Sequence, residues 1–356
     1  MRKIFCVLSV VILIFSFEIS VTAVDYSRIY ESVDEDVKEY VSQEDLDDGL
    51  QLTEHLSPRK IYGFIEKAGR NVFPSLKPLV ERILFIVLGS SLVLLITDKN
   101  YIQLFDTVTC IVSICLLHGS IYPLLSGVFV KLASLNGFLS LTYSYMAAGL
   151  AVGGKSVSAG LMPSTIVGIL SIISNCISVI FFPLLSGILS LTYASAIENG
   201  VLKNLLDMLK KLCITLIGII GIVFSGVTAL QKYIASAGDS IGMSAAKFII
   251  SGSMPIVGGV VKDAFGTIAA SSKMIVSSSG IFGIISVFIM LLPYLLTLIA
   301  TLIILRIGLV VSEGIGQSSV KALLKGYTGV FEIITALYVC EMMYIIMSIS
   351  LLISVA

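Results

Sequence analysis

The chain has 356 residues, of which 56% are hydrophobic and 13% are charged, and its formal net charge at pH 7 is zero. This composition excludes an ordinary soluble globular protein, and the charge balance does not indicate nucleic-acid binding. Several apolar runs reach the length of about 20 residues that crosses a bilayer core, so we expect an all-α, polytopic integral membrane protein with about six to eight transmembrane helices in the lipid bilayer.

The first 23 residues have the three parts of a secretory signal. Arg2 and Lys3 are the positive end, residues 4–17 are the apolar core, and Val21 and Ala23 flank a small-residue cleavage site. The sequence predicts a signal peptide at 1–23 that is cleaved after Ala23; the alternative is an uncleaved signal anchor. In both cases the residues that follow are expected to be translocated.

Residues 24–82 form a translocated polar region whose charge changes sign along its length. Between Asp25 and His55 there are eleven acidic and two basic residues, whereas the stretch from there to Arg82 holds six basic and two acidic ones. This order is typical of a solvated segment that leads into a stretch facing lipid headgroups.

An amphipathic helix at about 58–72 is expected within this region. Ser57 and Pro58 form a typical helix start, and Pro74 and Pro78 are expected to end the helix in a turn. The apolar positions follow helical spacing at Ile61, Phe64, Ile65, Ala68 and Val72.

Residues 83–356 are expected to form one polytopic membrane domain. Lys and Arg are spread evenly over the expected linkers, so the positive-inside rule does not fix the orientation. A separate amphipathic helix is expected at 199–212. The runs interpreted as membrane spans are 83–97, 108–130, 132–152, 164–193, 212–230, 280–305 and 330–355.

The weakly charged segment 231–279 holds the candidate functional residues. Gly238, Gly242 and Ala246 form a small-residue ridge that favours close contact between membrane helices. A proline and two glycines then predict a broken or re-entrant helix at 236–263. Either this element lines a conduit, or it is an interfacial hairpin that packs on a neighbouring subunit. The motif and conduit candidates are Asp239, Lys247, Pro255, Gly258, Gly259 and Asp263.

Other polar features do not form a catalytic constellation. Residues 149–156 match the phosphate-binding loop G-x-x-x-x-G-K-S, but they end a membrane span, where no strand can deliver the loop. His118 is interpreted as a structural histidine, and Glu332 and Glu341 are candidates for a buried polar stripe. The cysteines have no metal-binding spacing. We therefore expect no catalytic residue, no metal site and no cofactor.

The order of residues in 230–283 resembles the stage III sporulation protein AE family. The resemblance covers roughly residues 80–356 and implies a membrane subunit of a channel or secretion-like complex linking mother cell and forespore, in the mother-cell membrane, needed after engulfment. It implies other membrane subunits of that complex, a cytoplasmic secretion-type ATPase and a forespore membrane partner. The alternatives are a secondary transporter for a small solute and a non-conducting scaffold. The resemblance depends on Leu230-Gln-Lys232, Asp239, Lys247-Phe248, Pro255-x-Val-Gly-Gly259, Asp263-Ala264 and Gly280-x-x-Gly283.

Overall fold

The computed structural model describes residues 27–33, 37–38, 58–96, 101–197, 201–253, 258–315 and 318–356. The expected signal peptide at 1–23, with its cleavage site after Ala23, lies outside these residues. The described residues are almost entirely helical, with no strand among them, which confirms the all-α fold class. The elements are α2 (Ser27–Glu31), α6 (Pro58–Ile96), α7 (Ile102–Val152), α8 (Ser156–Cys176), the π-helix η2 (Ile177–Phe181), α9 (Phe182–Ile197), α10 (Val201–Ser253), α11 (Gly258–Ile315) and α12 (Ser318–Val355).

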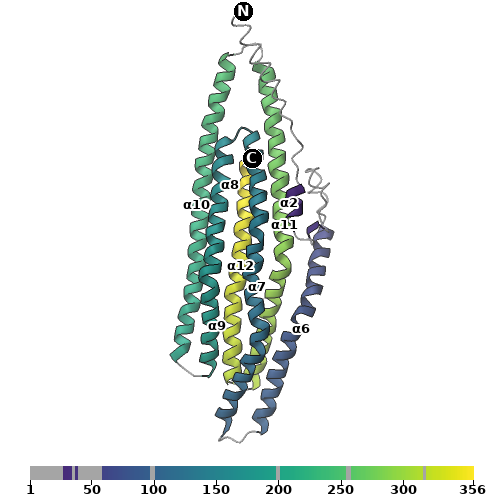
Figure 1. Cartoon of the computed structure of the whole chain (residues 1–356), viewed down its shortest axis with the longest axis vertical. Helices are drawn as coiled ribbons and strands as arrows, with labels where there is room; N and C mark the ends of the chain where they lie inside the picture. The colour runs from purple at the N-terminus through teal and green to yellow at the C-terminus, as the bar shows by residue number, and fades with distance from the viewer. Residues whose placement is uncertain are drawn as a thin grey trace, which may run out of the picture.

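The long helices form an elongated bundle (Figure 1). α12 and α7 lie in its centre, α8, α9 and α10 lie on one side, and α11 and α6 lie on the other. α10 and α6 are therefore the two opposite flanks of the bundle. α10 and α11 extend past the other helices at the end where the C-terminus lies.

Within the described residues, five helical segments are long and apolar enough to cross a membrane. The expected spans 108–130 and 132–152 belong to one helix, α7, which has 51 residues. Lys131 lies between the two runs and is half-buried, and a lone charged residue does not interrupt backbone hydrogen bonding. The five segments are Leu104–Val152, Ser156–Ile197, Leu202–Gly242, Ala269–Ile315 and Ser318–Val355.

The amphipathic helix expected at 58–72 is the first part of α6, and its expected end is wrong. α6 continues through Pro74 and Pro78 for 39 residues, to Ile96. Both prolines are exposed on the outer side of the helix. The carbonyl groups that lose a hydrogen bond at a proline can be solvated there, so the helix can bend without ending.

The two helical parts expected at 236–263 belong to two long helices, and the expected break at Pro255 lies outside the described residues. Residues 236–253 are the last part of α10, whose 53 residues begin with residues 201–212 of the amphipathic stretch expected at 199–212. Residues 258–263 are the first part of α11, which has 58 residues. The change from one helix to the other falls at 254–257, where Pro255 lies outside the described residues.

Glycines allow the helices to approach closely in the interior. A Cβ added to Gly326 of α12 would overlap the side chain of Thr192 in α9, and one added to Gly280 of α11 would lie 2.5 Å from Ile353 of α12. Small residues at helix crossings are the usual basis of packing between membrane helices, because they bring backbones together.

Candidate functional site

Asp239 of α10 binds the N-terminus of another helix. Its side chain is 8% exposed, and its Oδ1 accepts hydrogen bonds from the backbone amides of Val157, at 3.0 Å, and Ser158, at 3.3 Å. These amides belong to the first turn of α8, whose own N-cap, Lys155, makes no capping hydrogen bond through its side chain. A carboxylate at this position satisfies free amides and interacts favourably with the helix dipole. Asp239 therefore faces α8 in this chain, whereas the conduit interpretation expected it to face water or the other charged candidates.

The neighbouring glycine makes this contact possible. A Cβ added to Gly238 would lie 2.8 Å from Cγ1 of Val157, so α10 and α8 are in close contact there. Gly242, four residues later, is exposed, and an added Cβ would meet nothing within 4 Å. Only the first of these two ridge glycines is a point of close packing within this chain.

The turn between α7 and α8 contains the segment that matches a phosphate-binding loop. Gly154 has a φ of 78°, in the left-handed region that favours glycine. The turn follows a helix, and the amides of Val157 and Ser158 are already bound by Asp239. The Nζ of Lys155 donates to the backbone oxygens of Val355 and Ala356 at the end of α12, the latter at 2.8 Å. In this arrangement the turn holds helices together, and its lysine points away from where a phosphate would bind.

The side chains of Lys232 and Ser272 complete this meeting point of helices. We call it the α7–α8 junction, and it consists of Gly149–Ser158, Lys232, Asp239, Ser272 and the end of α12. Lys232 of α10 donates to Ser354 Oγ at 3.1 Å. Ser272 of α11 donates to the carbonyl of Gly149. Five long helices are therefore tied together at one level by polar contacts.

The remaining motif residues fall in two places. Lys247 and Ala246 belong to α10, and Gly258, Gly259 and Asp263 belong to the start of α11, but the structure does not describe their side chains. The structure therefore brings Asp239 and Gly238 into the α7–α8 junction together with Lys155 and Ser272. The sequence had no signal that linked Ser272 to this junction.

The two glutamates of α12 have different environments. Glu332 is exposed and pairs with Arg306 of α11 at 2.6 Å. Glu341 is only 5% exposed, and its Oε2 has no hydrogen-bond partner among the described residues. They do not form one polar stripe. His118 of α7 shares a hydrogen bond of 2.8 Å between its Nδ1 and the hydroxyl of Tyr193 in α9.

Comparison with known proteins gives two matches. A family model described as Stage III sporulation protein AE matches residues 58–356. The chain is also similar to the curated stage III sporulation protein AE of Bacillus subtilis (strain 168), with 28% identity over 153 residues. That alignment covers 42% of this chain and 38% of the relative, so it spans less than half of either protein. No solved structure is significantly similar to this chain.

Proposed function

The chain belongs to the stage III sporulation protein AE family, and on this basis we propose that it is a membrane subunit of a channel or secretion-like complex that links mother cell and forespore. Its place is the mother-cell membrane around the forespore, and it acts after engulfment. Its partners are other membrane subunits of this complex, a cytoplasmic secretion-type ATPase and a forespore membrane protein. The observation that carries the proposal is a difference between the two flanks of the bundle: the outer surface of α10 is apolar at a depth where the outer surface of α6 is charged.

The outer flank, α10, defines an apolar depth. Residues 212–231 carry no charged side chain and are bounded by Lys210 and Lys211 at one end and by Lys232 at the other. At 1.5 Å per residue this window is about 30 Å long, which matches the hydrocarbon thickness of a bilayer. Exposed apolar side chains continue along it, as expected for a surface that faces lipid.

Contacts between helices relate this window to α6. The ammonium group of Lys210 lies beside Gly329 of α12, so the lower end of the window is level with this glycine. Gly308 of α11 contacts both Ile83 of α6 and Leu324 of α12, which lies slightly lower. α6 and α11 run side by side in the same direction (Figure 1), so the part of α6 that precedes Ile83 extends alongside the window.

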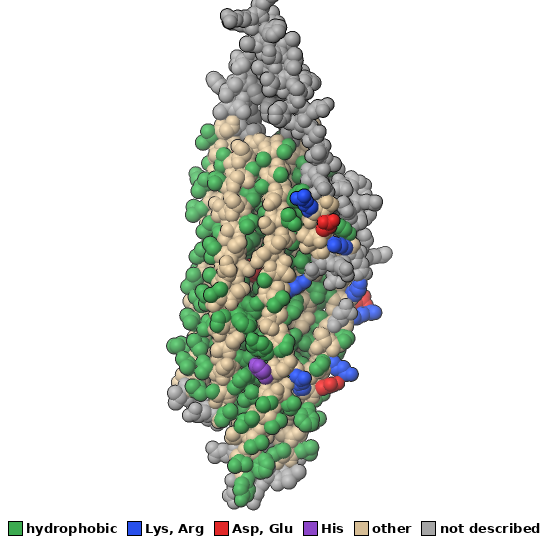
Figure 2. All heavy atoms as spheres, viewed as in Figure 1, with side chains coloured by type: hydrophobic (Ala, Val, Ile, Leu, Met, Phe, Trp, Pro, Cys, Tyr) green, Lys and Arg blue, Asp and Glu red, His purple; other side chains and the backbone are tan. Residues whose placement is uncertain are grey.

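That part of α6 carries a charged outer face, which we call the α6 flank. It is defined by Glu66, Lys67, Arg70, Lys77 and Glu81, all of which are exposed. Figure 2 shows acidic and basic side chains gathered on this side of the bundle, whereas the opposite side is covered by hydrophobic side chains. Glu66 lies 17 positions before Ile83, which is about 25 Å along a helix. Leu324 lies five positions, or about 7.5 Å, below Gly329, so Glu66 is about 18 Å inside the apolar depth, whereas Glu81 lies below its lower end.

At the other end of α6, apolar side chains are exposed outside the apolar depth that α10 defines. The hairpin of α6 and α7 continues past the level of Leu324 and projects beyond the other helices (Figure 1). Many of its side chains are apolar and exposed outside that depth. They include Leu84, Phe85, Leu88, Leu92, Leu104, Phe105 and Val108.

A single bilayer around one isolated chain cannot accommodate both the charged α6 flank inside the apolar depth and the apolar hairpin outside it. Ionic side chains at bilayer depth must face water or protein, and an extended apolar surface outside that depth is expected to be covered by a partner. A subunit that borders a water-filled passage on its α6 flank and contacts other subunits through its apolar hairpin meets both conditions. This reasoning supports a conducting assembly over a stand-alone transporter.

Deletion of the gene in its native host tests the sporulation role. We expect loss of heat-resistant spores, with forespores that are engulfed but small or collapsed and with normal vegetative growth. Normal sporulation would refute the role and favour the solute transporter.

Cysteine labelling tests the passage itself. Single cysteines replace Arg70 on the α6 flank, whose side chain is 78% exposed, and Ile214 on α10, which is 61% exposed and lies inside the apolar window. The six native cysteines are replaced first. In sonicated membranes from sporulating cells, a charged maleimide should label the Arg70→Cys chain and leave the matched Ile214→Cys chain unlabelled. Equal protection of both positions would contradict a water-filled passage and favour the non-conducting scaffold.

A further inference from the structure

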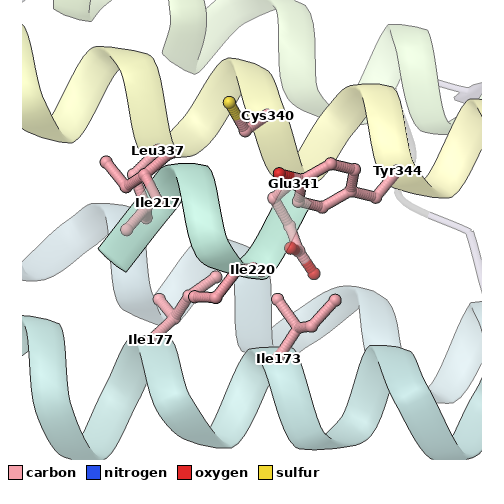
Figure 3. Close-up of a pocket in the computed structure, with 8 residues that line it drawn as sticks. All are labelled: Ile173, Ile177, Ile217, Ile220, Leu337, Cys340, Glu341 and Tyr344. Carbon is pink, nitrogen blue, oxygen red and sulfur yellow. The ribbon is translucent and has the colours of Figure 1, made fainter. Parts of the chain in front are cut away.

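A small open cavity, with about 10 Å³ of space for the centre of a water molecule, lies between α8, η2, α10 and α12. Its walls are almost entirely apolar: four isoleucines come from α8, η2 and α10, and a leucine comes from α12. Its polar members are Glu341, Cys340 and Tyr344, all of α12. Figure 3 shows the carboxyl group of Glu341 pointing away from α12, toward Ile220 and Ile173 on the facing helices.

The Glu341 carboxyl group differs from other acidic groups in the described bundle. Asp239 receives two amide hydrogen bonds, and Glu332 pairs with Arg306. Glu341 is as buried as Asp239, and Oε2 of Glu341 and Oδ2 of Asp239 both lack a hydrogen-bond partner among the described residues. The difference is that the Asp239 carboxylate is held through its Oδ1 by two amides at a helix N-terminus, whereas no such donor meets Glu341 in its apolar surroundings. An unpaired ionised carboxylate in such surroundings costs several kcal/mol, so an arrangement of this kind is rarely retained without a use.

The groups around the cavity do not supply a counter-charge. α8, η2 and α10 contribute only isoleucines to its wall. The titratable neighbours are Cys340 and Tyr344 on α12 and Tyr143 on α7, and the hydroxyl of Tyr143 is engaged with Ser348. None of these groups is a cation. A metal cation such as Ca²⁺ would need about six oxygen ligands, which the cavity does not provide.

We propose that Glu341 is a proton-binding site inside the membrane bundle. In the bound state the carboxyl group is neutral and fits the apolar wall. In the released state the O–H bond breaks and the proton passes to a water molecule held in the cavity, whose edge is formed by the half-buried Ile217, Ile220, Cys340 and Tyr344. The site lies level with the apolar window of α10, because Ile217 and Ile220 line the same cavity.

The π-helix gives the cavity a wall that can change. η2 interrupts the α-helical hydrogen bonding between α8 and α9, and its first residue, Ile177, faces the carboxyl group across the cavity. π-helical turns are rare and occur frequently at functional sites. A shift between π- and α-helical bonding at η2 would move Ile177 and alter the access of water to Glu341.

Carbodiimide labelling tests the bound state. Dicyclohexylcarbodiimide is apolar and reacts with a protonated carboxyl group: the acid proton moves to a nitrogen of the reagent, the carboxylate oxygen bonds to its central carbon, and the adduct rearranges to a stable N-acylurea. In vesicles containing the full chain at neutral pH, peptide mass spectrometry should find the adduct on Glu341, several-fold above the level on the matched control Glu332. The label should decrease as the pH rises and should be absent from the Glu341→Gln chain. Labelling of Glu341 no greater than that of Glu332 would overturn the proposal.

Substitution tests the released state. Glutamine resembles the neutral acid in shape, so the Glu341→Gln chain should keep the thermal midpoint of the wild-type protein while the host loses most of its heat-resistant spores. Glu332→Gln should leave the spore count unchanged. Wild-type sporulation by the Glu341→Gln strain would overturn the proposal, because release of the proton would then have no use. The labelling result does not depend on the sporulation role, so the two proposals can fail separately.

Discussion

Replacing Gly238 with alanine adds one methyl group where α10 lies closest to α8. The new Cβ would lie 2.8 Å from Cγ1 and 3.2 Å from Cγ2 of Val157. Carbon atoms in good contact are about 3.5–4.0 Å apart, so Val157 must move by roughly 0.7 Å. The backbone amide of the same valine donates to Asp239, so the movement also strains the cap of α8.

The magnitude is a balance of two terms. Overpacking costs about 1–3 kcal/mol, and replacement of a helical glycine by alanine gains about 0.5–1 kcal/mol. We therefore expect Gly238→Ala to lower the free energy of unfolding by roughly 0.5–2 kcal/mol. Gly242→Ala is the matched control on the same helix. Its added Cβ meets nothing within 4 Å, so it should gain about 0.5–1 kcal/mol.

Thermal unfolding of the purified chain in detergent measures the difference. An unfolding entropy of about 2.1 cal/mol/K per residue implies that 1 kcal/mol shifts the midpoint of a chain of this length by roughly 1.3 °C. The two variants should then differ by about 1–4 °C, with Gly238→Ala below the wild type and Gly242→Ala above it. A midpoint for Gly238→Ala equal to that for Gly242→Ala would refute the close contact of α10 with α8.

Two more substitutions test other contacts in the bundle. Asp239→Ala removes the acceptor of two buried amides and should lower the free energy of unfolding by about 1–3 kcal/mol. Asp207→Ala, on the exposed face of the same helix, should change it by less than about 0.5 kcal/mol. Equal thermal midpoints for the two variants would contradict the capping role of Asp239. Gly326→Ala places a methyl group against Thr192 and should lower the thermal midpoint by more than Gly238→Ala does. Gly314→Ala, whose added Cβ meets nothing within 4 Å, should not lower it. An unchanged midpoint for Gly326→Ala would show that α12 and α9 are not in close contact.

Much of the helical content followed from composition and local pattern. Long apolar runs predicted membrane helices, five of which are long and apolar enough to cross a membrane. The predicted break at Pro255 lies outside the described residues, and Gly258 and Gly259 are the first residues of α11. The sequence analysis divided α7 into two spans at Lys131, although a single charge does not end a helix. Residues 83–96 of another expected span belong to α6, which is not among the five segments long and apolar enough to cross a membrane. The prolines of α6 misled in the same way, since their exposed position allowed the helix to continue.

The candidate site could be found only in part. Asp239 and Gly238 stood out in the sequence, but their partner Val157 lies 82 residues from Asp239 along the chain. No local pattern contains that pairing. Glu332 and Glu341 looked alike nine positions apart on one helix, and only the neighbouring helices made one an exposed ion pair and the other a buried carboxyl group.

The sequence by itself determined that this protein is helical and apolar, which residues are candidates, and which family it resembles. Those properties depend on side-chain hydrophobicity and on short-range backbone preferences, which are written locally. The tertiary structure decided which charge meets which helix end, which glycine is a contact, and that the α6 flank lies level with the apolar window of α10. These outcomes depend on how distant helices are aligned against one another, and that alignment is set by packing across the whole bundle.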